Sequence, residues 1–236
     1  ESERLYTTLL NSISHELRTP IATIKGASTS LLHHSTHDNI QNRVQLIHDI
    51  EDSADRLNRL VENLLDMSRL ESGRLSLKRE WCDITDIISV AMKQLSECQS
   101  RQIILDLPAN LPLIHVDFGL IVQIFINLID NACHYTPADK PIRITTHQQG
   151  KRLDVSVIDK GAGSPPELLE RIFDKFYRLP GTVAGGTGLG LSISRGLAEA
   201  HKAKLTAENM PDGGAKFTLS LSLQEVPPPV REVKDE

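Results

Sequence analysis

Apolar residues recur at steps of three and four along the first part of the chain, which is the spacing of one face of an α-helix. Pro20 interrupts this stripe, but the stripe continues beyond it, so a bend is expected there instead of an end. The pattern predicts one long amphipathic helix. Its apolar face consists of Leu5, Leu9, Ile13, Leu17, Ile21, Ile24, Ser28 and Leu31.

A polar stretch at residues 33–39 leads to a second stripe of the same spacing, and Gly73 follows it as a stop signal. The second stripe consists of Ile40, Val44, Ile47, Ala54, Leu57, Val61, Leu64 and Met67. Two long helices with a short connection pack antiparallel. Because a two-helix hairpin leaves an apolar seam, the pattern predicts a homodimer in which two hairpins form a four-helix bundle.

The pattern after residue 82 mixes short alternating runs with helical stripes. Helices are predicted to start at Asp83 and Asp117, which can cap them, and after the two prolines Pro165 and Pro166. The helices from Asp83 and Asp117 should run to about Cys98 and Asn131. A further helix is predicted over 189–201, and strands are predicted over 101–107, 142–147, 153–159, 204–208 and 215–223. Clustered strands and helices favour an α+β sandwich.

These patterns divide the chain into four parts. Residues 1–75 form the helical hairpin, 76–82 a linker, 83–223 the α+β domain, and 224–236 a Pro-rich, charged tail that is predicted to be disordered. The fold class is therefore multidomain.

Composition excludes several classes of protein. The 236 residues carry 26 basic and 31 acidic side chains, a net charge of −5, so a sequence-independent nucleic-acid binder is not expected. The longest apolar run, residues 120–128, falls far short of the ~20 residues that span a bilayer. No signal peptide is recognised. We expect a cytoplasmic fragment without direct membrane contact, from a parent protein that is anchored in a membrane.

The three cysteines, Cys82, Cys98 and Cys133, are an odd number without C-x-x-C spacing. This count predicts neither a disulfide framework nor a zinc site, and it favours a reducing compartment.

The first candidate for chemistry is the run SHELRTP, residues 14–20. His15 lies about 200° around the helix from the apolar stripe, so it should face away from the seam. An exposed histidine is most often just solvated. Here Glu16 can accept a hydrogen bond from one ring nitrogen and leave the other as a nucleophile. Thr19 follows one turn later on the same face.

Two glycine clusters form the second candidate. Asp159, Gly161 and Gly163 end a predicted strand, and the run GGTGLGL at 185–191 opens a predicted helix. Glycines let the backbone approach a ligand, and amides at a helix start favour phosphate. The second cluster fits neither a Walker A nor a Rossmann pattern. Residues 164–184 between the clusters are predicted to be a mobile lid.

The third candidate is the pair Asn127 and Asn131, which are spaced i, i+4 on one face of a predicted helix. Two amide oxygens on an apolar helix suit a hard cation that bridges phosphates. Two surface amides without a ligand are the alternative interpretation.

Taken in order, the motifs SHELRTP, NLIDNACHYTP, DKGAG, IFDKFYR and GGTGLGLSI resemble those of the sensor histidine kinases of bacterial two-component signalling. The resemblance covers about residues 1–223. A finer resemblance, to potassium-responsive kinases of the KdpD type, rests on the runs NLLDMSR, KREW, IHVD and IFDKF.

The resemblance implies a dimerisation and phosphotransfer hairpin followed by an ATP-binding domain of the Bergerat type. His15 matches the phosphoacceptor, Glu16 its activating acidic neighbour and Thr19 a residue used in dephosphorylation of the partner. Arg178 matches a basic residue that reaches the γ-phosphate. The implied partners are a second copy of the chain and the receiver domain of a response regulator, and the implied cofactors are ATP and Mg²⁺.

The remaining implied contacts are with ATP and Mg²⁺. Asn131, with Asn127, matches the magnesium ligands, and Asp159 matches the aspartate that binds adenine. The other implied nucleotide contacts are His134, Tyr135, Gly161, Gly163, Gly186, Thr187, Gly188, Leu189 and Gly190. His134 stands where the family usually has lysine, which weakens a phosphate contact or makes it depend on pH.

Two other functions compete with a protein-histidine autokinase. An ATPase of the gyrase or chaperone type shares the nucleotide fold, but it would leave the SHELRTP hairpin without a purpose. A non-catalytic dimeric scaffold that binds nucleotide is the other alternative, and stable phosphorylation of the chain would separate it from a kinase.

Overall fold

The structure is a computed structural model. The residues that it describes are 2–33, 40–95, 98, 101–179 and 188–223. The chain divides into two compact units, one of residues 1–75 and 174–193 and the other of residues 76–173 and 194–236.

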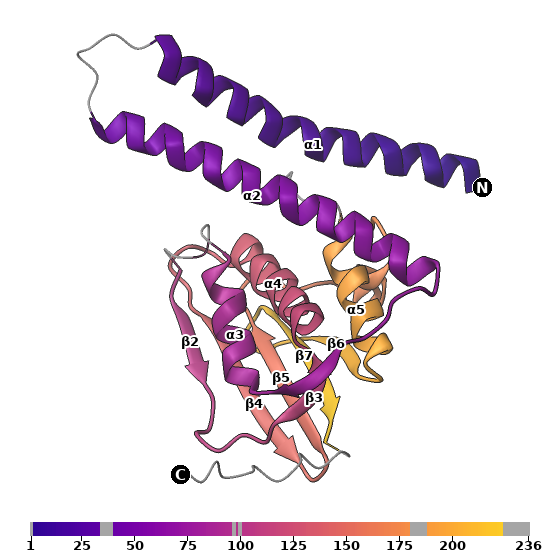
Figure 1. Ribbon diagram of the computed structural model, residues 1–236. Helices are drawn as coiled ribbons and strands as arrows, with labels where there is room; N and C mark the ends of the chain where they lie inside the picture. Colours follow the sequence, from indigo (N-terminus) through magenta and orange to yellow (C-terminus); the bar gives the residue numbers. More distant parts are fainter. Residues whose placement is uncertain (1, 34–39, 96–97, 99–100, 180–187, 224–236) are drawn as a thin grey trace, which may run out of the picture. The chain divides into compact units, whose positions relative to one another are not determined.

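The predicted hairpin is confirmed as two helices, α1 (Ser2–His33) and α2 (Ile40–Glu71), which lie side by side (Figure 1). Helix α1 runs through Pro20 without ending. Helix α2 ends where Gly73 takes a φ of +64°, and the amide of Arg74 donates to the carbonyl of Arg69. Gly73 is thus the predicted stop.

The hairpin leaves an apolar face uncovered, as its sequence predicts. Ile21 of α1 and Val44, Ile47 and Val61 of α2 belong to the predicted stripes, yet they are 46–54% exposed. Ala27 and Leu60 are buried in the described part of the hairpin, and so is Pro20. Burial of the stripes therefore requires a surface beyond this hairpin.

The second unit is built on a five-stranded sheet with the strand order β2-β4-β5-β7-β6. Strands β2 and β4 are parallel and the other neighbours antiparallel. The strands are β2 (Ile103–Asp106), β4 (Ile142–Gln149), β5 (Arg152–Ile158), β6 (Lys204–Asn209) and β7 (Ala215–Ser222). All five predicted strands are confirmed.

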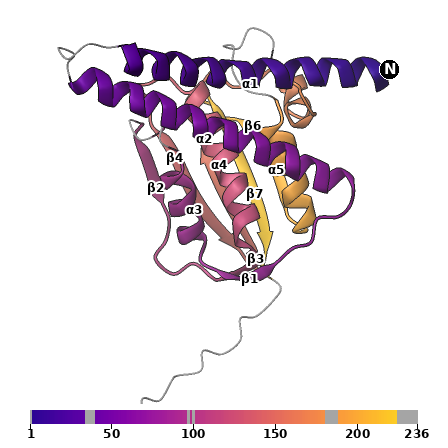
Figure 2. The ribbon, with the colours of Figure 1, turned by 45° about the horizontal axis from the view of Figure 1, so that its top comes forward.

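Three helices cover one face of this sheet (Figures 1 and 2): α3 (Ile84–Lys93), α4 (Phe118–Tyr135) and α5 (Gly190–Ala200). The predicted caps are confirmed. Asp83 accepts a hydrogen bond from the amide of Thr85 at 2.7 Å, and Asp117 accepts one from the amide of Leu120 at 3.2 Å. Helix α3 ends before Cys98, and α4 continues beyond Asn131 to Tyr135.

Sequence patterning missed a small second sheet. Strands β1 (Arg79–Cys82) and β3 (Ile114–Asp117) pair antiparallel, and Trp81 stacks on His115 with ring centroids 4.9 Å apart. β1 lies inside residues 76–82, which the sequence assigns to a linker. Each strand has four residues, too few to show a period of two clearly.

The expectation of no disulfide was wrong. Cys98 and Cys133 form one, with their Cα atoms 6.0 Å apart. Their sequence separation is 35 residues, and only the packing of the segment after α3 against α4 brings them together. Cys82 is buried and remains a thiol.

A buried histidine joins the end of α5 to β3. His201 is 8% exposed; its Nδ1 donates to the carbonyl of Leu197 at 2.7 Å and its Nε2 accepts from the amide of Asp117 at 3.1 Å. Burial lowers the pKa of His201, the Leu197 carbonyl opposes this, and the charges of Arg79 and Asp117 have smaller, opposing effects. The neutral ring satisfies both contacts, so it is the form that folding favours.

This contact predicts a pH dependence of folding. The unfolded chain protonates His201 at its usual pKa of 6.5, whereas the folded chain does so only at lower pH, so the free energy of unfolding should decrease as the pH falls below 6.5. His201→Gln should cost about 1–2 kcal/mol at pH 7.5 and less at pH 5.5. Urea unfolding of both chains at the two pH values measures this, and an equal cost at both would contradict it.

Candidate functional site

Asp159, at the end of β5, is the most deeply buried carboxylate of the candidate set, with 4% of its surface exposed. Its Oδ1 accepts two backbone hydrogen bonds, from Gly161 at 2.8 Å and from Ala215 at 3.1 Å. Burial raises the pKa of Asp159, and the two amides partly offset this. Both bonds use the same oxygen, so Oδ2 is the one left to a ligand.

The glycine loop after Asp159 packs closely on the end of α4. A Cβ at Gly161 would lie 2.7 Å from the carbonyl oxygen of Tyr135. This contact admits no side chain, which explains the glycine. The structure therefore brings together Asp159, Gly161 and Tyr135, which the sequence predicts as one site.

Asn209, at the end of β6, holds the next part of this loop and was not predicted. Its Oδ1 accepts from the amide of Ser164 at 2.9 Å, and its Nδ2 donates to the carbonyl of Ser164 at 2.6 Å. The neighbouring Gly163 has a φ of +71° and lies against the same amide group. No sequence signal links residues 164 and 209, because the pairing depends on the sheet.

Helix α4 carries the two candidate asparagines. Nδ2 of Asn127 donates to Oγ of Ser194 in α5 at 3.2 Å, and Ser194 is fully buried. Asn131 lies one turn later and is half-buried. At the end of the helix the rings of His134 and Tyr135 meet edge to face at 5.0 Å, and both residues are exposed. The side-chain amides of Asn127 and Asn131 thus lie between the buried part of α4 and its exposed C-terminal turn.

The second glycine cluster is described only in part. Gly186 and Thr187 lie outside the described residues. Gly188 has a φ of +68°, and its carbonyl accepts a hydrogen bond from the amide of Phe176 at 3.0 Å. Leu189 is fully buried, and Gly190 begins α5.

The segment predicted as a lid contains ordered turns. It includes two short 3₁₀ turns, Pro166–Leu168 and Arg171–Phe173. Ile172 and Phe173 of the second turn are buried. Arg195 of α5 lies over the Phe173 ring at 5.1 Å and pairs with Glu170 at 3.0 Å. Arg178 follows these turns and is half-buried, and residues 180–184 of the predicted lid lie outside the described residues.

The SHELRTP run lies on α1. The side chain of His15 is outside the described part of the structure, although its backbone is helical. Glu16 is 7% exposed, and its Oε2 accepts a hydrogen bond from Nη2 of Arg56 in α2 at 3.2 Å. Arg56 was not predicted, because it is 40 residues away in the sequence. It anchors the predicted activating carboxylate across the hairpin.

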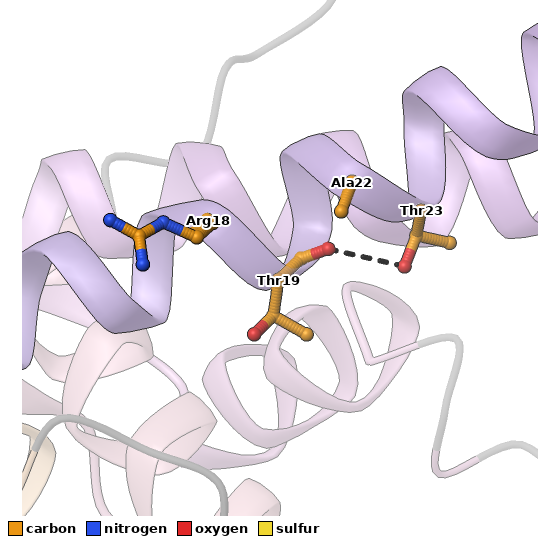
Figure 3. Close-up of a pocket in the computed structure, with 4 residues that line it drawn as sticks. All are labelled: Arg18, Thr19, Ala22 and Thr23. Carbon is orange, nitrogen blue, oxygen red and sulfur yellow. Dashed lines mark hydrogen bonds between the residues drawn. The ribbon is translucent and has the colours of Figure 1, made fainter.

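Thr19 lines a pocket on α1 together with Arg18, Ala22 and Thr23 (Figure 3). The hydroxyl of Thr23 donates to the carbonyl of Thr19 at 3.2 Å, and the Thr19 hydroxyl points away from this bond (Figure 3). Arg18 and Thr19 are both exposed. A pocket lined by these four residues therefore begins within one turn after His15.

The described residues contain neither a membrane-spanning helix nor a cluster of metal ligands. None of the described helices combines the length and apolarity of a membrane span. No three His, Cys, Asp or Glu side chains of the described part are placed to hold a metal ion together.

Two family models match the chain. Residues 6–73 match the model described as "His Kinase A (phospho-acceptor) domain". Residues 117–225 match the model described as "Histidine kinase-, DNA gyrase B-, and HSP90-like ATPase". The first match contains His15, Glu16 and Thr19, and the second contains the asparagines, Asp159 and both glycine clusters.

Curated relatives match over nearly the full chain. The sensor protein KdpD of Escherichia coli (strain K12) is 38% identical over 228 residues, which cover 96% of this chain and 25% of KdpD. The sensor histidine kinase WalK of Bacillus subtilis (strain 168) is 30% identical over 222 residues, which cover 91% of this chain and 36% of WalK. The chain therefore spans about a quarter of the length of the KdpD relatives that it matches.

Solved structures have the same fold. Full-length ShkA in complex with AMPPNP matches with a TM-score of 0.63 and 26% identity, over 91% of this chain and 45% of ShkA. The histidine kinase AdeS of Acinetobacter baumannii matches with a TM-score of 0.62 and 24% identity, over 89% of this chain and 98% of that chain.

Proposed function

The chain belongs to the sensor histidine kinases and is KdpD-like, and from this premise we propose that it is an ATP-dependent protein-histidine autokinase whose phosphoacceptor is His15. The observation that carries the proposal is the Asp159 site. A buried carboxylate with one oxygen held by two amides lies beside the end of α4, in a chain that also matches the phosphoacceptor hairpin.

Asp159 is suited to bind the adenine of ATP. With Oδ1 held by Gly161 and Ala215, Oδ2 is oriented to accept a hydrogen bond from an exocyclic amine. Tyr135 offers an exposed ring at the same loop. The ShkA match supports this, because ShkA was solved with an ATP analogue.

The side-chain amides of the two asparagines on α4 fit a magnesium ion. Asn131 is the main proposed ligand and Asn127 the second, because amide oxygens suit hard cations and the two lie on one helix face. The ion would neutralise charge on the phosphates of ATP. The hydrogen bond from Nδ2 of Asn127 to Oγ of Ser194 orients the side-chain amide of Asn127.

The remaining nucleotide contacts are proposed from the backbone. The backbone of the second glycine cluster, residues 186–190, binds phosphate oxygens, because glycines let the backbone approach a ligand closely. Gly163 shapes the loop after Asp159, which is proposed to bind adenine. His134 approaches the phosphates from the end of α4.

Phosphoryl transfer is proposed to occur in line. Nε2 of His15 attacks the γ-phosphorus while the bond to the bridging oxygen breaks and ADP leaves. Glu16 accepts the hydrogen bond from Nδ1–H and stabilises the positive charge on the ring. Arg178 neutralises the oxygens of the transferred group. Catalysis then depends mainly on position and electrostatics.

The phosphoryl group is proposed to pass to an aspartate of a response regulator. Thr19 lies one turn after His15 in an exposed pocket, where it can position a water for the reverse, phosphatase role. The exposed stripe residues of α1 and α2 are proposed to pair with a second copy of the chain. We propose a parent protein that is anchored in the membrane, with this part in the cytoplasm.

The test is incubation of the chain with γ-labelled ATP and Mg²⁺. Protein-bound label that is labile to acid and stable to alkali supports the autokinase. Release of labelled phosphate without labelled protein would indicate an ATPase of the gyrase or chaperone type. Nucleotide binding without either product would indicate a scaffold.

Glu16→Gln is expected to lower the rate of autophosphorylation about 100-fold, the size of a lost acid–base group. The glutamine oxygen can still accept from Arg56, so the contact across the hairpin is kept while the charge is lost. Single-turnover labelling measures the rate. Arg56→Gln is the matched control: if it lowers the rate as much as Glu16→Gln, the contact between the helices is what matters, and the chemical role of Glu16 is contradicted.

A further inference from the structure

The disulfide between Cys98 and Cys133 lies beside the proposed nucleotide site. Cys133 is two residues after Asn131 and two before Tyr135, in the last turn of α4. The carbonyl of Tyr135 is in turn the group on which Gly161 packs. The link therefore ties the turn that carries the proposed ligands to the segment after α3.

Arg101 contacts both halves of this pair. Its backbone amide donates to the carbonyl of Cys98 at 2.9 Å, and its Nη2 donates to the carbonyl of Cys133 at 2.6 Å. Its Nη1 is buried and makes no hydrogen bond within the described residues. Arg101 therefore ties together the backbone at both ends of the disulfide.

Cys82 lies in a contrasting environment. It is buried in β1, and burial raises the pKa of its thiol, with the charges of Glu80 and Asp117 acting in the same direction. A thiol of this kind reacts poorly with oxidants. Oxidation of the chain is therefore directed to Cys98 and Cys133. Cys82 serves as the control for oxidation of a cysteine outside this pair.

We propose that Cys98 and Cys133 are a reversible redox couple, oxidised by peroxides, that sets the affinity of the chain for nucleotide. This proposal rests on the proposed function, because the site it regulates is the ATP site. In the oxidised chain the disulfide holds the last turn of α4 against the segment after α3. Reduction frees this turn, which then has to be ordered by the ligand, so nucleotide binds more weakly.

The chemistry balances with one peroxide. The first thiolate attacks a peroxide oxygen, the O–O bond breaks, and a sulfenic acid and hydroxide form. The second thiolate attacks the sulfenic sulfur, the S–S bond forms, and hydroxide leaves. The two thiol protons convert both hydroxides to water, so two electrons pass from sulfur to the peroxide. A dithiol reverses the step by exchange.

The test compares the full chain after hydrogen peroxide and after dithiothreitol. Maleimide labelling in denaturant is expected to count one thiol per oxidised chain and three per reduced chain. AMPPNP is expected to bind about three- to tenfold more tightly to the oxidised chain, as measured by calorimetry. The melting temperature of the oxidised chain should be about 10 °C higher, because the link closes a long loop.

Variants separate the pair from general oxidation. Cys98→Ser and Cys98→Ala should bind AMPPNP equally after either treatment, whereas Cys82→Ser should respond as the wild type does. The comparison of the two redox states of the wild type needs no variant to fold. AMPPNP should also protect the disulfide from dithiothreitol by the same factor that it gains in affinity.

The possible failures are distinct. Three reactive thiols after peroxide would overturn the couple. Equal affinities of the two redox states for AMPPNP would overturn the coupling to the site. Absence of AMPPNP binding in both states would overturn the proposed nucleotide site itself, and the regulatory proposal with it, even if the thiol count shows that the disulfide forms.

Discussion

Asp159→Asn is expected to weaken ATP binding at least about 100-fold and to reduce autophosphorylation with it. The asparagine oxygen can still accept from the amides of Gly161 and Ala215, so the loop keeps its shape. The amide nitrogen then takes the place of Oδ2 and points a donor at the donor of the adenine amine. Loss of one charge-assisted hydrogen bond and an added donor–donor contact account for about 3 kcal/mol.

The stability of the ligand-free chain distinguishes binding from folding in this variant. Because burial raises the pKa of Asp159 above its usual 3.8, its ionised form opposes folding, and stability is lost as the pH rises through that raised pKa. Asparagine removes this cost. Asp159→Asn should therefore unfold at the same or a higher urea concentration at pH 7.5. A variant that both loses ATP and unfolds more readily would assign Asp159 a structural role.

Local signals in the sequence were enough to predict most elements of the fold. The steps of three and four in residues 5–31 and 40–67 predicted both long helices. Asp83 and Asp117 correctly predicted the residues that cap the starts of α3 and α4. These signals lie within one or two turns of the chain. Strands β1 and β3 were missed, because four residues carry little periodicity and their pairing joins positions far apart in sequence.

Contacts between distant segments account for what was missed at the site. Arg56 reaches Glu16 across 40 residues, and Asn209 reaches Ser164 across 45. Cys98 and Cys133 were assigned no disulfide, because counting cysteines says nothing about which of them meet in the folded chain. Each of these residues supports a predicted residue without belonging to a motif, so only the fold reveals it.

His15→Gln is expected to abolish protein-bound label from γ-labelled ATP, a loss of at least about 1,000-fold. Glutamine is a good helix former, so α1 should continue through residue 15 as it does in the wild type. The amide has no ring nitrogen with an available lone pair, so no phosphoramidate bond can form. Asn131, Tyr135 and Asp159 of the proposed ATP site lie in the other unit, so the affinity of the chain for AMPPNP should be unchanged.

Histidines elsewhere in the chain supply the control for this loss. His48 lies on α2 and is exposed, so His48→Gln removes an exposed helical histidine at a site without a predicted role. This variant should be labelled as the wild type is. If label persists in His15→Gln and disappears in another histidine variant, that other histidine is the phosphoacceptor and the assignment of His15 is contradicted. Loss of label together with loss of AMPPNP binding would show that the substitution disturbs more than the nucleophile, and only a selective loss assigns His15 the covalent step.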